Sequence, residues 1–244
     1  MIRLLKNSIA FTIGLILGTS LAFATPSSLL LTPDNVVLFN GAVDRDSVAK
    51  VMANLHEVEK NRKDISKPIY LVINSGGGSI YAGNVFIEYA KTVKNLNTIT
   101  IFAASMAHAI VQALPGKRYV TSHGLFMAHR AKGSFRGQFN SGEVESQLKL
   151  WTGIVTNMEI TASTRIGISL LEYKTKIKDE WWTTAKESIK ENVADEVVQM
   201  VCTHELVDKK IVEEHRNMFG AVRVTFSSCP LFQFPLSIER IQNK

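Results

Sequence analysis

Ser105 is the residue whose position in the chain most clearly indicates chemistry. It follows an apolar run, 98–102, that predicts a strand, and a helix is predicted to begin directly after it. A serine at such a turn points its hydroxyl outward, and the amides that follow it lie at the positive end of the helix. Amides placed in this way stabilise the oxyanion that forms when a serine attacks a carbonyl, by roughly 3 kcal/mol for each donor. A serine in this position is also a common helix cap, so the interpretation depends on its neighbours.

His129 supplies the general base that a serine nucleophile needs at neutral pH. It stands at the end of another predicted strand, 125–128. Two other histidines compete for this role: His108 lies one helical turn after Ser105, and His123 lies in a predicted turn. We interpret both as structural.

A glycine-rich loop, Asn74-Ser75-Gly76-Gly77-Gly78-Ser79, follows a continuous apolar run and precedes a predicted helix. Glycines at such a place permit a positive φ and let backbone amides approach a ligand closely. A plain tight turn is the alternative. The chain contains no G-x-x-x-x-G-K-[ST] motif, so ATP binding is not supported.

The elements that must position these residues alternate between strand and helix. Five short apolar runs predict strands, at 36–39, 69–73, 98–102, 118–121 and 125–128. Helical spacing of apolar residues between them predicts helices that begin near residues 46, 80 and 106. This alternation predicts an α/β fold with a mostly parallel sheet and helices packed on it.

A longer helix is predicted from Asn140, where Glu143 completes a capping box. Its apolar stripe consists of Val144, Leu148, Trp151, Val155 and Met158. The stripe is typical of a helix that faces the core, and equally of a helix that projects to meet another subunit. Spacing alone does not distinguish the two.

The first 24 residues have the features of a secretory signal peptide. Arg3 and Lys6 give a basic start, an apolar stretch follows, and Ala22-Phe23-Ala24 forms a small-x-small end. The apolar stretch is short for the roughly 20 residues that span a bilayer, which argues against an uncleaved anchor. We therefore expect cleavage after Ala24 and export to the periplasm or the extracellular space.

The rest of the chain, residues 25–244, has the composition of a globular domain. With 45% hydrophobic and 20% charged residues, a disordered chain and a polytopic membrane protein are both poor fits. We expect a leader at 25–33, a catalytic domain at 34–200 and a C-terminal appendage at 201–244. The net charge of +6 is spread without a Lys/Arg run, so no nucleic-acid partner is expected.

Cys202 and Cys229 are the two cysteines of the chain. In a reducing cytosol they would be small core residues, whereas in an exported protein an even number makes a disulfide reasonable. We hypothesise that they pair and fix the C-terminal segment to the domain.

Several segments together resemble the motif blocks of ClpP, the proteolytic subunit of the Clp protease. The blocks are 73–79, 103–106, 127–129, 133–138, 180–187 and 193–195, in family order and at nearly family spacing. The resemblance implies a ClpP/crotonase-like spiral of β-β-α units with a projecting "handle" helix. It also implies a homo-oligomeric ring.

The resemblance further implies roles for individual residues. Ser105 is the nucleophile, His129 the base, and the amides of Gly78 and Met106 form the oxyanion hole. The third member of the triad falls at Glu180, with Asp179 as its rival if the loop shifts by one residue. Substrate contacts are implied at Gly77 and along a strand edge formed by Gly133, Ser134 and Phe135, to which an extended peptide adds by backbone pairing.

The implied function is a serine endopeptidase that hydrolyses peptides or unfolded polypeptides without a cofactor or a catalytic metal. Because an exported chain meets neither ATP nor an ATP-driven unfoldase, we expect ATP-independent cleavage and no ATPase partner. Arg130-Ala131 stand where the family usually has Gln-Pro, which alters the shape or charge of the substrate groove.

Three alternatives remain open. An SppA-like signal peptide peptidase pairs serine with lysine, and Lys132 lies nearby in sequence. A crotonase proper uses carboxylates on acyl-CoA thioesters, which the signal peptide argues against. A catalytically inactive ClpP-like scaffold is the third, although nothing structural requires Ser105, His129 and Gly78 together.

Overall fold

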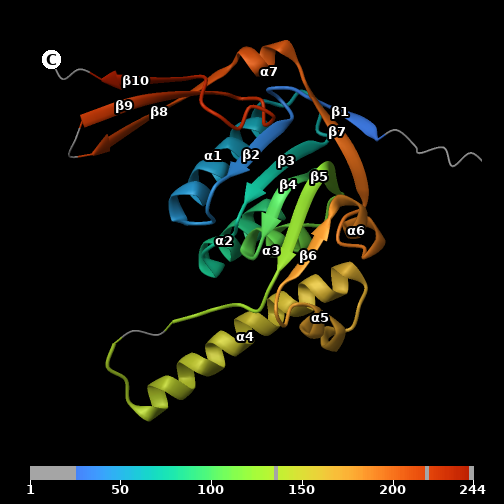
Figure 1. Cartoon of the computed structure of the whole chain (residues 1–244), viewed down its shortest axis with the longest axis vertical. Helices are drawn as coiled ribbons and strands as arrows, with labels where there is room; N and C mark the ends of the chain where they lie inside the picture. Colours follow the sequence, from blue (N-terminus) through green and yellow to red (C-terminus); the bar gives the residue numbers. More distant parts are fainter. Residues whose placement is uncertain (1–25, 135–136, 218–219, 242–244) are drawn as a thin grey trace, which may run out of the picture.

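The fold is built on a seven-stranded sheet in the order β1-β7-β5-β4-β3-β2, with β6 added to β5. All its pairs are parallel except β5 with β6. The computed structural model describes residues 26–134, 137–217 and 220–241. The strands are β1 (Ser27–Leu31), β2 (Val36–Asn40), β3 (Ile69–Ser75), β4 (Leu96–Ala104), β5 (Arg118–Ala128), β6 (Trp181–Thr184) and β7 (Glu196–Cys202). The prediction of a mostly parallel α/β fold is confirmed (Figure 1).

Seven helices lie between or after the described strands. They are α1 (Arg45–Asn61), α2 (Ile80–Ala90), α3 (Met106–Ala113), α4 (Ser141–Ile166), α5 (Leu170–Lys176), α6 (Ala185–Lys190) and α7 (His204–Asp208). Asp44 begins α1 with a capping box, because its side chain accepts from the Ser47 amide and the Ser47 hydroxyl accepts from the Asp44 amide.

The sheet has a core on each face, and β3 shows how the sequence divides between them. Leu71 and Ile73 pack into the larger core, which the helices α1, α2 and α3 cover. Tyr70 and Val72 pack on the opposite face, with Leu206 of α7 and Cys229. All four side chains are buried, as a continuous apolar run in a parallel strand predicts.

α4 is the element that stands furthest from the sheet (Figure 1). The predicted capping box at its start is confirmed, since Asn140 accepts from the Glu143 amide and Glu143 accepts from the Asn140 amide. Gly167 ends the helix in the left-handed conformation that glycine favours. Of its residues only Ala162, Ser163 and Ile166, near its C-terminal end, are buried. Its N-terminal part, which is mostly exposed, projects from the body as a handle would.

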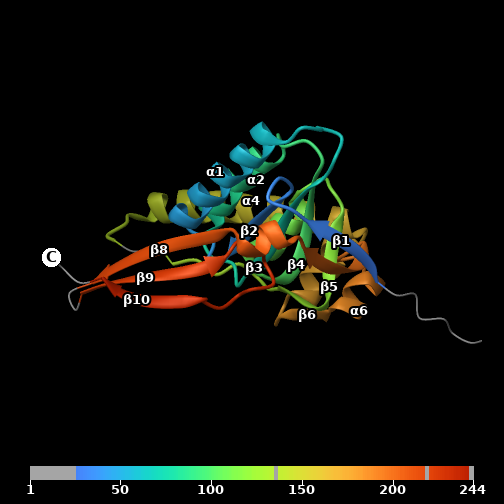
Figure 2. The same cartoon turned by 90° about the horizontal axis from the view of Figure 1, so that it is seen from above.

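The C-terminal segment forms a separate antiparallel sheet of β8 (Lys210–Asn217), β9 (Gly220–Ser227) and β10 (Ser237–Ile241). Figures 1 and 2 show it at the opposite end of the molecule from α6, beside α1. A disulfide joins Cys202, at the end of β7, to Cys229, just after β9. The pairing therefore connects this second sheet to the main one.

Three sequence-based boundaries differ from the structure. The leader predicted at 25–33 contributes β1, a parallel edge strand whose partner is β7. The boundary predicted at 200 falls inside β7. The two strands predicted at 118–121 and 125–128 are one strand, β5, which continues through residues 122–124 and shifts its register against β4.

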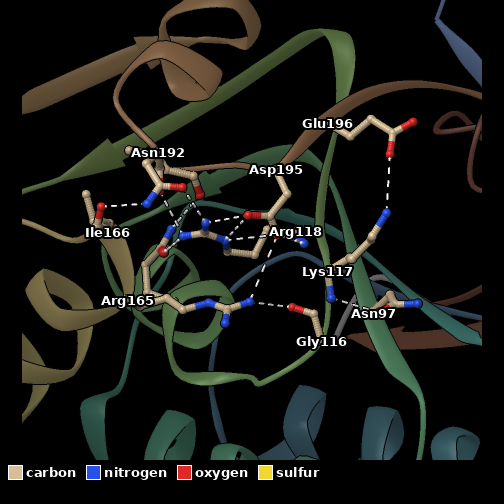
Figure 3. Close-up of polar contacts among 11 residues, drawn as sticks. Asn97, Gly116, Lys117, Arg118, Arg165, Ile166, Asn192, Asp195 and Glu196 are labelled. Carbon is tan, nitrogen blue, oxygen red and sulfur yellow. Dashed lines mark hydrogen bonds and ion pairs between the residues drawn. The ribbon is translucent and has the colours of Figure 1, made fainter.

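An ion pair between buried Arg118 and partly exposed Asp195 fixes the start of β5 to the residues just before β7 (Figure 3). The Arg118 guanidinium, 3% exposed, donates to Asp195 at 2.5 Å. It also donates to Gln112 Oε1 at 2.8 Å and to the carbonyl and side-chain oxygens of Asn192. Burial opposes ionisation of Asp195, but the hydrogen bonds and charge of Arg118 outweigh it and lower the pKa of that carboxyl.

Within the described ranges, no helix combines the length and the apolar character that a bilayer span requires. The predicted signal peptide, 1–24, lies outside the residues that the structure describes.

Candidate active site

Ser105 forms the turn between β4 and α3. Its backbone has φ 54° and ψ −119°, a conformation that side-chain-bearing residues rarely adopt. Its amide donates to the Met127 carbonyl at 2.8 Å, which holds the turn against β5. The Ser105 side chain makes no capping hydrogen bond to α3. The helix-cap interpretation is therefore wrong for this serine, and the strained turn is of the kind that presents a nucleophile.

His129 lies next to Ser105 because their strands are neighbours. Ala104, at the end of β4, pairs with Met127 near the end of β5. Chain ends of adjacent parallel strands meet at the same edge of a sheet, so the residues that follow them come together. The His129 Nε2 and Ser105 Oγ atoms are 2.9 Å apart. This is the hydrogen bond by which an imidazole removes the proton of a serine hydroxyl.

The glycine loop packs against the Ser105 turn. A Cβ atom on Gly77 would lie 2.5 Å from the Ala104 carbonyl oxygen and 2.7 Å from the Met106 amide nitrogen. Gly78 has φ 152° and no room for a Cβ beside the Val43 carbonyl. Both positions therefore require glycine. The plain-turn alternative explains the backbone angles but not the contact with the residues that flank Ser105.

Gly78 and Met106 line the same pocket as Ser105. Among the described residues, neither amide donates a hydrogen bond to the protein. Two unsatisfied amides beside a serine hydroxyl are the donors that an acyl-transfer oxyanion needs. The Met106 amide is also the first of α3, where the helix dipole favours negative charge.

Neither of the two candidate acids, Asp179 and Glu180, is hydrogen-bonded to His129 among the described residues. Asp179 and Glu180 lie between α5 and β6, and both are exposed. Glu180 instead accepts from the Trp182 indole N–H at 2.9 Å.

The other two histidines lie away from Ser105 Oγ. His108 is buried between the Phe126 and Trp181 rings, and its nitrogens have no partner among the described atoms. Burial, and then the charge of Arg118, lowers the pKa of His108 from 6.5 to about 4. His123 is exposed on β5. Both positions agree with the structural interpretation of these residues.

A pocket of about 120 Å³ opens beside Ser105 and His129. Its walls come from α2, α3, α4, α5 and the residues just after β5. The lining side chains include Ile80, Ala109, Val155, Met158, Glu159, Tyr173 and Ile177. Sequence reasoning missed Glu159 and Tyr173. The signal for Glu159 was present, since positions 155, 158 and 159 share one face of a helix.

The predicted substrate strand is only partly described. Gly133 and Ser134 are exposed and form no regular strand, and Phe135 lies outside the described residues. A Cβ on Gly133 would lie 3.0 Å from the ring of Trp151, so the segment runs close over α4. Lys132 lines the pocket, but within the described ranges it makes no hydrogen bond to Ser105. No cluster of three or more His, Cys, Asp or Glu side chains that could hold a metal is found in the described part of the chain.

Comparison with known proteins adds independent information. A family model described as Clp protease matches residues 22–201. The chain is 31% identical over 169 residues to the ATP-dependent Clp protease proteolytic subunit 1 of Frankia casuarinae. The aligned region covers 68% of this chain and 78% of that protein. It is 29% identical over 169 residues to the subunit 1 of Protochlamydia amoebophila, covering 66% and 79%. It is 25% identical over 172 residues to the corresponding subunit of Streptococcus mutans, covering 69% and 87%.

Proposed function

The chain belongs to the Clp protease family, and from this premise we propose that it is a serine endopeptidase with Ser105 as nucleophile and His129 as general base. The observation that carries the proposal is the 2.9 Å contact between His129 Nε2 and Ser105 Oγ, on a serine that does not cap its helix. An inactive scaffold has no need of this contact or of the strained turn that presents the hydroxyl.

Peptide hydrolysis at this site proceeds in two halves. Ser105 Oγ attacks the carbonyl carbon of the substrate while its proton passes to His129 Nε2. The imidazolium then protonates the departing amine, the C–N bond breaks, and the acyl group remains as an ester on Ser105. In the second half His129 takes a proton from water, the resulting hydroxide attacks the ester, and Ser105 recovers its proton as the acid leaves.

The amides of Gly78 and Met106 stabilise the oxyanion in both halves. Each tetrahedral intermediate carries its negative charge on the former carbonyl oxygen, which these donors bind more strongly than the neutral carbonyl. Removing one such donor in other serine hydrolases costs about 100-fold to 1,000-fold in kcat. The requirement for glycine at positions 77 and 78 follows from the same arrangement, because a side chain there would displace the donors.

We assign the third triad position to Glu180, with Asp179 as the rival. A glutamate can orient an imidazole as an aspartate does. In the structure Glu180 accepts a hydrogen bond from the Trp182 indole N–H. This hydrogen bond must break before the Glu180 carboxylate can reach His129. The segment that carries it is next to the one that carries His129, since the Arg130 amide donates to the Ile177 carbonyl at 3.2 Å.

The proposed substrates are peptides and already unfolded polypeptides, cleaved without ATP outside the cytosol. The Cys202–Cys229 disulfide supports export, since disulfides persist in oxidising compartments. The sequence features of residues 1–24 support it as well. The relatives above are named as subunits of ATP-dependent proteases, so independence from ATP would distinguish this chain from them.

The test is hydrolysis of an unfolded, reduced and alkylated protein by the mature chain, without nucleotide. Wild type should cleave it, and Ser105→Ala and His129→Ala should each lose at least about 10⁴-fold in kcat/KM. Ser122→Ala, at an exposed serine on β5, is the matched control and should cleave as wild type does. Equal cleavage by Ser105→Ala would exclude the proposal. Loss in Lys132→Ala with retention in His129→Ala would favour a Ser/Lys enzyme instead.

A further inference from the structure

We propose that the pocket beside Ser105 selects substrates with Lys or Arg at P1, the residue whose carbonyl Ser105 attacks, and that Glu159 makes this selection. The inference rests on the proposed function and specifies its substrate class. Three observations carry it: the position of the pocket, the burial and partners of the Glu159 carboxylate, and the apolar character of the surrounding walls.

The pocket is the place where a P1 side chain must go. It is lined by Ser105 and His129, and also by Gly78 and Met106 with their free amides. A substrate carbonyl held between these groups points its P1 side chain into the adjoining space. The pocket, of about 120 Å³, is lined by Met158 and Glu159 of α4, by Tyr173 of α5 and by Ile177, which follows α5.

Glu159 is a nearly buried carboxylate in this pocket, with its side chain 12% exposed. Its one ion-pair partner among the described residues is Lys174, whose ammonium lies 3.4 Å from Oε2. Lys174 is itself 41% exposed, so solvent competes for that ammonium. Within the described ranges, Oε1 accepts no hydrogen bond, and a carboxylate has room for several donors.

Glu159 shares the pocket with Tyr173. Burial raises the pKa of Tyr173, and the charge of the Glu159 carboxylate raises it further. Tyr173 is 6% exposed and lines the same pocket. A carboxylate held among apolar walls is stabilised strongly by a cation that enters beside it.

The walls suit the stem of a basic side chain. Apolar side chains line the pocket together with Glu159: Ile80, Ala109, Val155, Met158 and Ile177. Lysine and arginine carry a long apolar stem and a cationic head, so they can fill such walls and still reach a carboxylate. An acidic P1 side chain would meet the like charge of Glu159. Lys132, which also lines the pocket, is an exposed residue, so its repulsion of a basic head is reduced by solvent.

The experiment compares peptides that differ only at P1, carrying Lys, norleucine or Glu. Norleucine keeps the stem of lysine and lacks the ammonium. For wild type we expect kcat/KM for Lys to exceed that for norleucine by about tenfold or more, the effect of one hydrogen-bonded charge pair. Glu159→Gln should reduce this ratio to near one. Lys174→Met should raise it above the wild-type ratio, because it removes the competing ammonium.

Glu172→Gln, at an exposed position on α5, is the control and should leave the Lys-to-norleucine ratio as in wild type. A wild-type ratio near or below one, a preference for Glu, or a ratio that Glu159→Gln leaves unchanged would each overturn the inference. Poor folding of a variant would lower the cleavage of all three peptides. It would not lower the Lys-to-norleucine ratio in Glu159→Gln and raise it in Lys174→Met, which is the expected result. If no peptide is cleaved and Ser105 is not acylated by any of them, the proposed function itself has failed. Cleavage without a basic preference refutes only the inference about P1.

Discussion

At the scale of single residues, the site depends on a serine held in a backbone conformation that costs free energy. Ser105 has φ 54° and ψ −119°, and the hydrogen bond from its amide to Met127 and the contact of Gly77 with its turn hold it there. The pairing of Ser105 with His129 could be predicted because both residues end strands of one parallel sheet. Glu159 was missed although it shares a helix face with Val155 and Met158, because the spacing does not show that this face packs beside Ser105.

The position of the acid could not be predicted either. Glu180 and Asp179 lie in a short connection before β6, where a shift of one residue changes which carboxylate faces His129. The sequence contains no signal for the indole N–H of Trp182, which holds Glu180 in this structure. The contact of Ser105 with His129 follows from the ends of two paired strands, whereas the choice between Glu180 and Asp179 depends on a loop and stays a prediction.

His108 predicts a loss of stability in acid. Its pKa is lowered from 6.5 to about 4 by burial and by Arg118, so between these values the unfolded chain binds a proton that the folded chain does not. The stability that the folded chain has with His108 neutral is fully present above pH 6.5 and is lost as the pH falls toward 4. Between pH 7.5 and 4.5 it amounts to about 2 to 3 kcal/mol.

Urea unfolding at these two pH values measures the effect. His108→Leu, which fills the space between Phe126 and Trp181 with an apolar group, should lose less stability between pH 7.5 and 4.5 than wild type, by about that amount. Equal losses in the two proteins would show that His108 carries no such penalty.

At the scale of elements, β2 to β5 and the helices α1 to α4 could be predicted from their own apolar patterns, whereas β6, β7 and the helices after α4 were not predicted. The helix predicted from Asn140 begins where its capping box lies. β1 could not be predicted, since the partner that turns residues 27–31 into a strand is β7, far along the chain. For the same reason β5 was predicted as two strands: Ser122, His123 and Gly124 read as a turn until the neighbouring strand is known.

The hydrogen bonds of the Arg118 guanidinium to Asp195, Gln112 and Asn192 indicate that one side chain stabilises several elements at once. Arg118→Met leaves Asp195, Gln112 and Asn192 without their shared donor, and should lower the free energy of unfolding by about 3 to 5 kcal/mol. Lys91→Met, which removes the exposed pair with Glu88, is the matched control and should cost about 1 kcal/mol at most. Urea denaturation of both variants decides, and similar losses would contradict the role given to the network.

At the scale of the whole molecule, α4 is an unusual feature, because a long helix projects from the body with much of its apolar stripe exposed (Figure 1). Two residues of the stripe, Val144 and Leu148, are 51% and 55% exposed. Apolar surface gathered on a projecting helix is typical of an interface. Of the two interpretations that the stripe allowed, a projecting helix is the one that this exposure supports, and we infer that copies of the chain assemble through it.

Leu148→Glu tests this inference by placing a charge in the exposed stripe. Sedimentation velocity at micromolar concentration should show wild type as an oligomer and Leu148→Glu largely as a monomer, because a buried, unpaired carboxylate is costly. Lys149→Glu introduces the same residue one position along, on another face of the helix, and should assemble as wild type does. A monomeric wild type, or an oligomer unaffected by Leu148→Glu, would contradict assembly through α4.

The central claim is that the Ser105 hydroxyl is activated by the His129 imidazole, and one measurement addresses it directly. The mature protein is treated with a serine-directed fluorophosphonate, digested and mapped by mass spectrometry. The adduct should lie on Ser105 alone, and His129→Ala should slow its formation by at least about 100-fold, since general-base assistance typically contributes that much or more. An adduct on another serine, or the same labelling rate in His129→Ala as in wild type, would contradict the account.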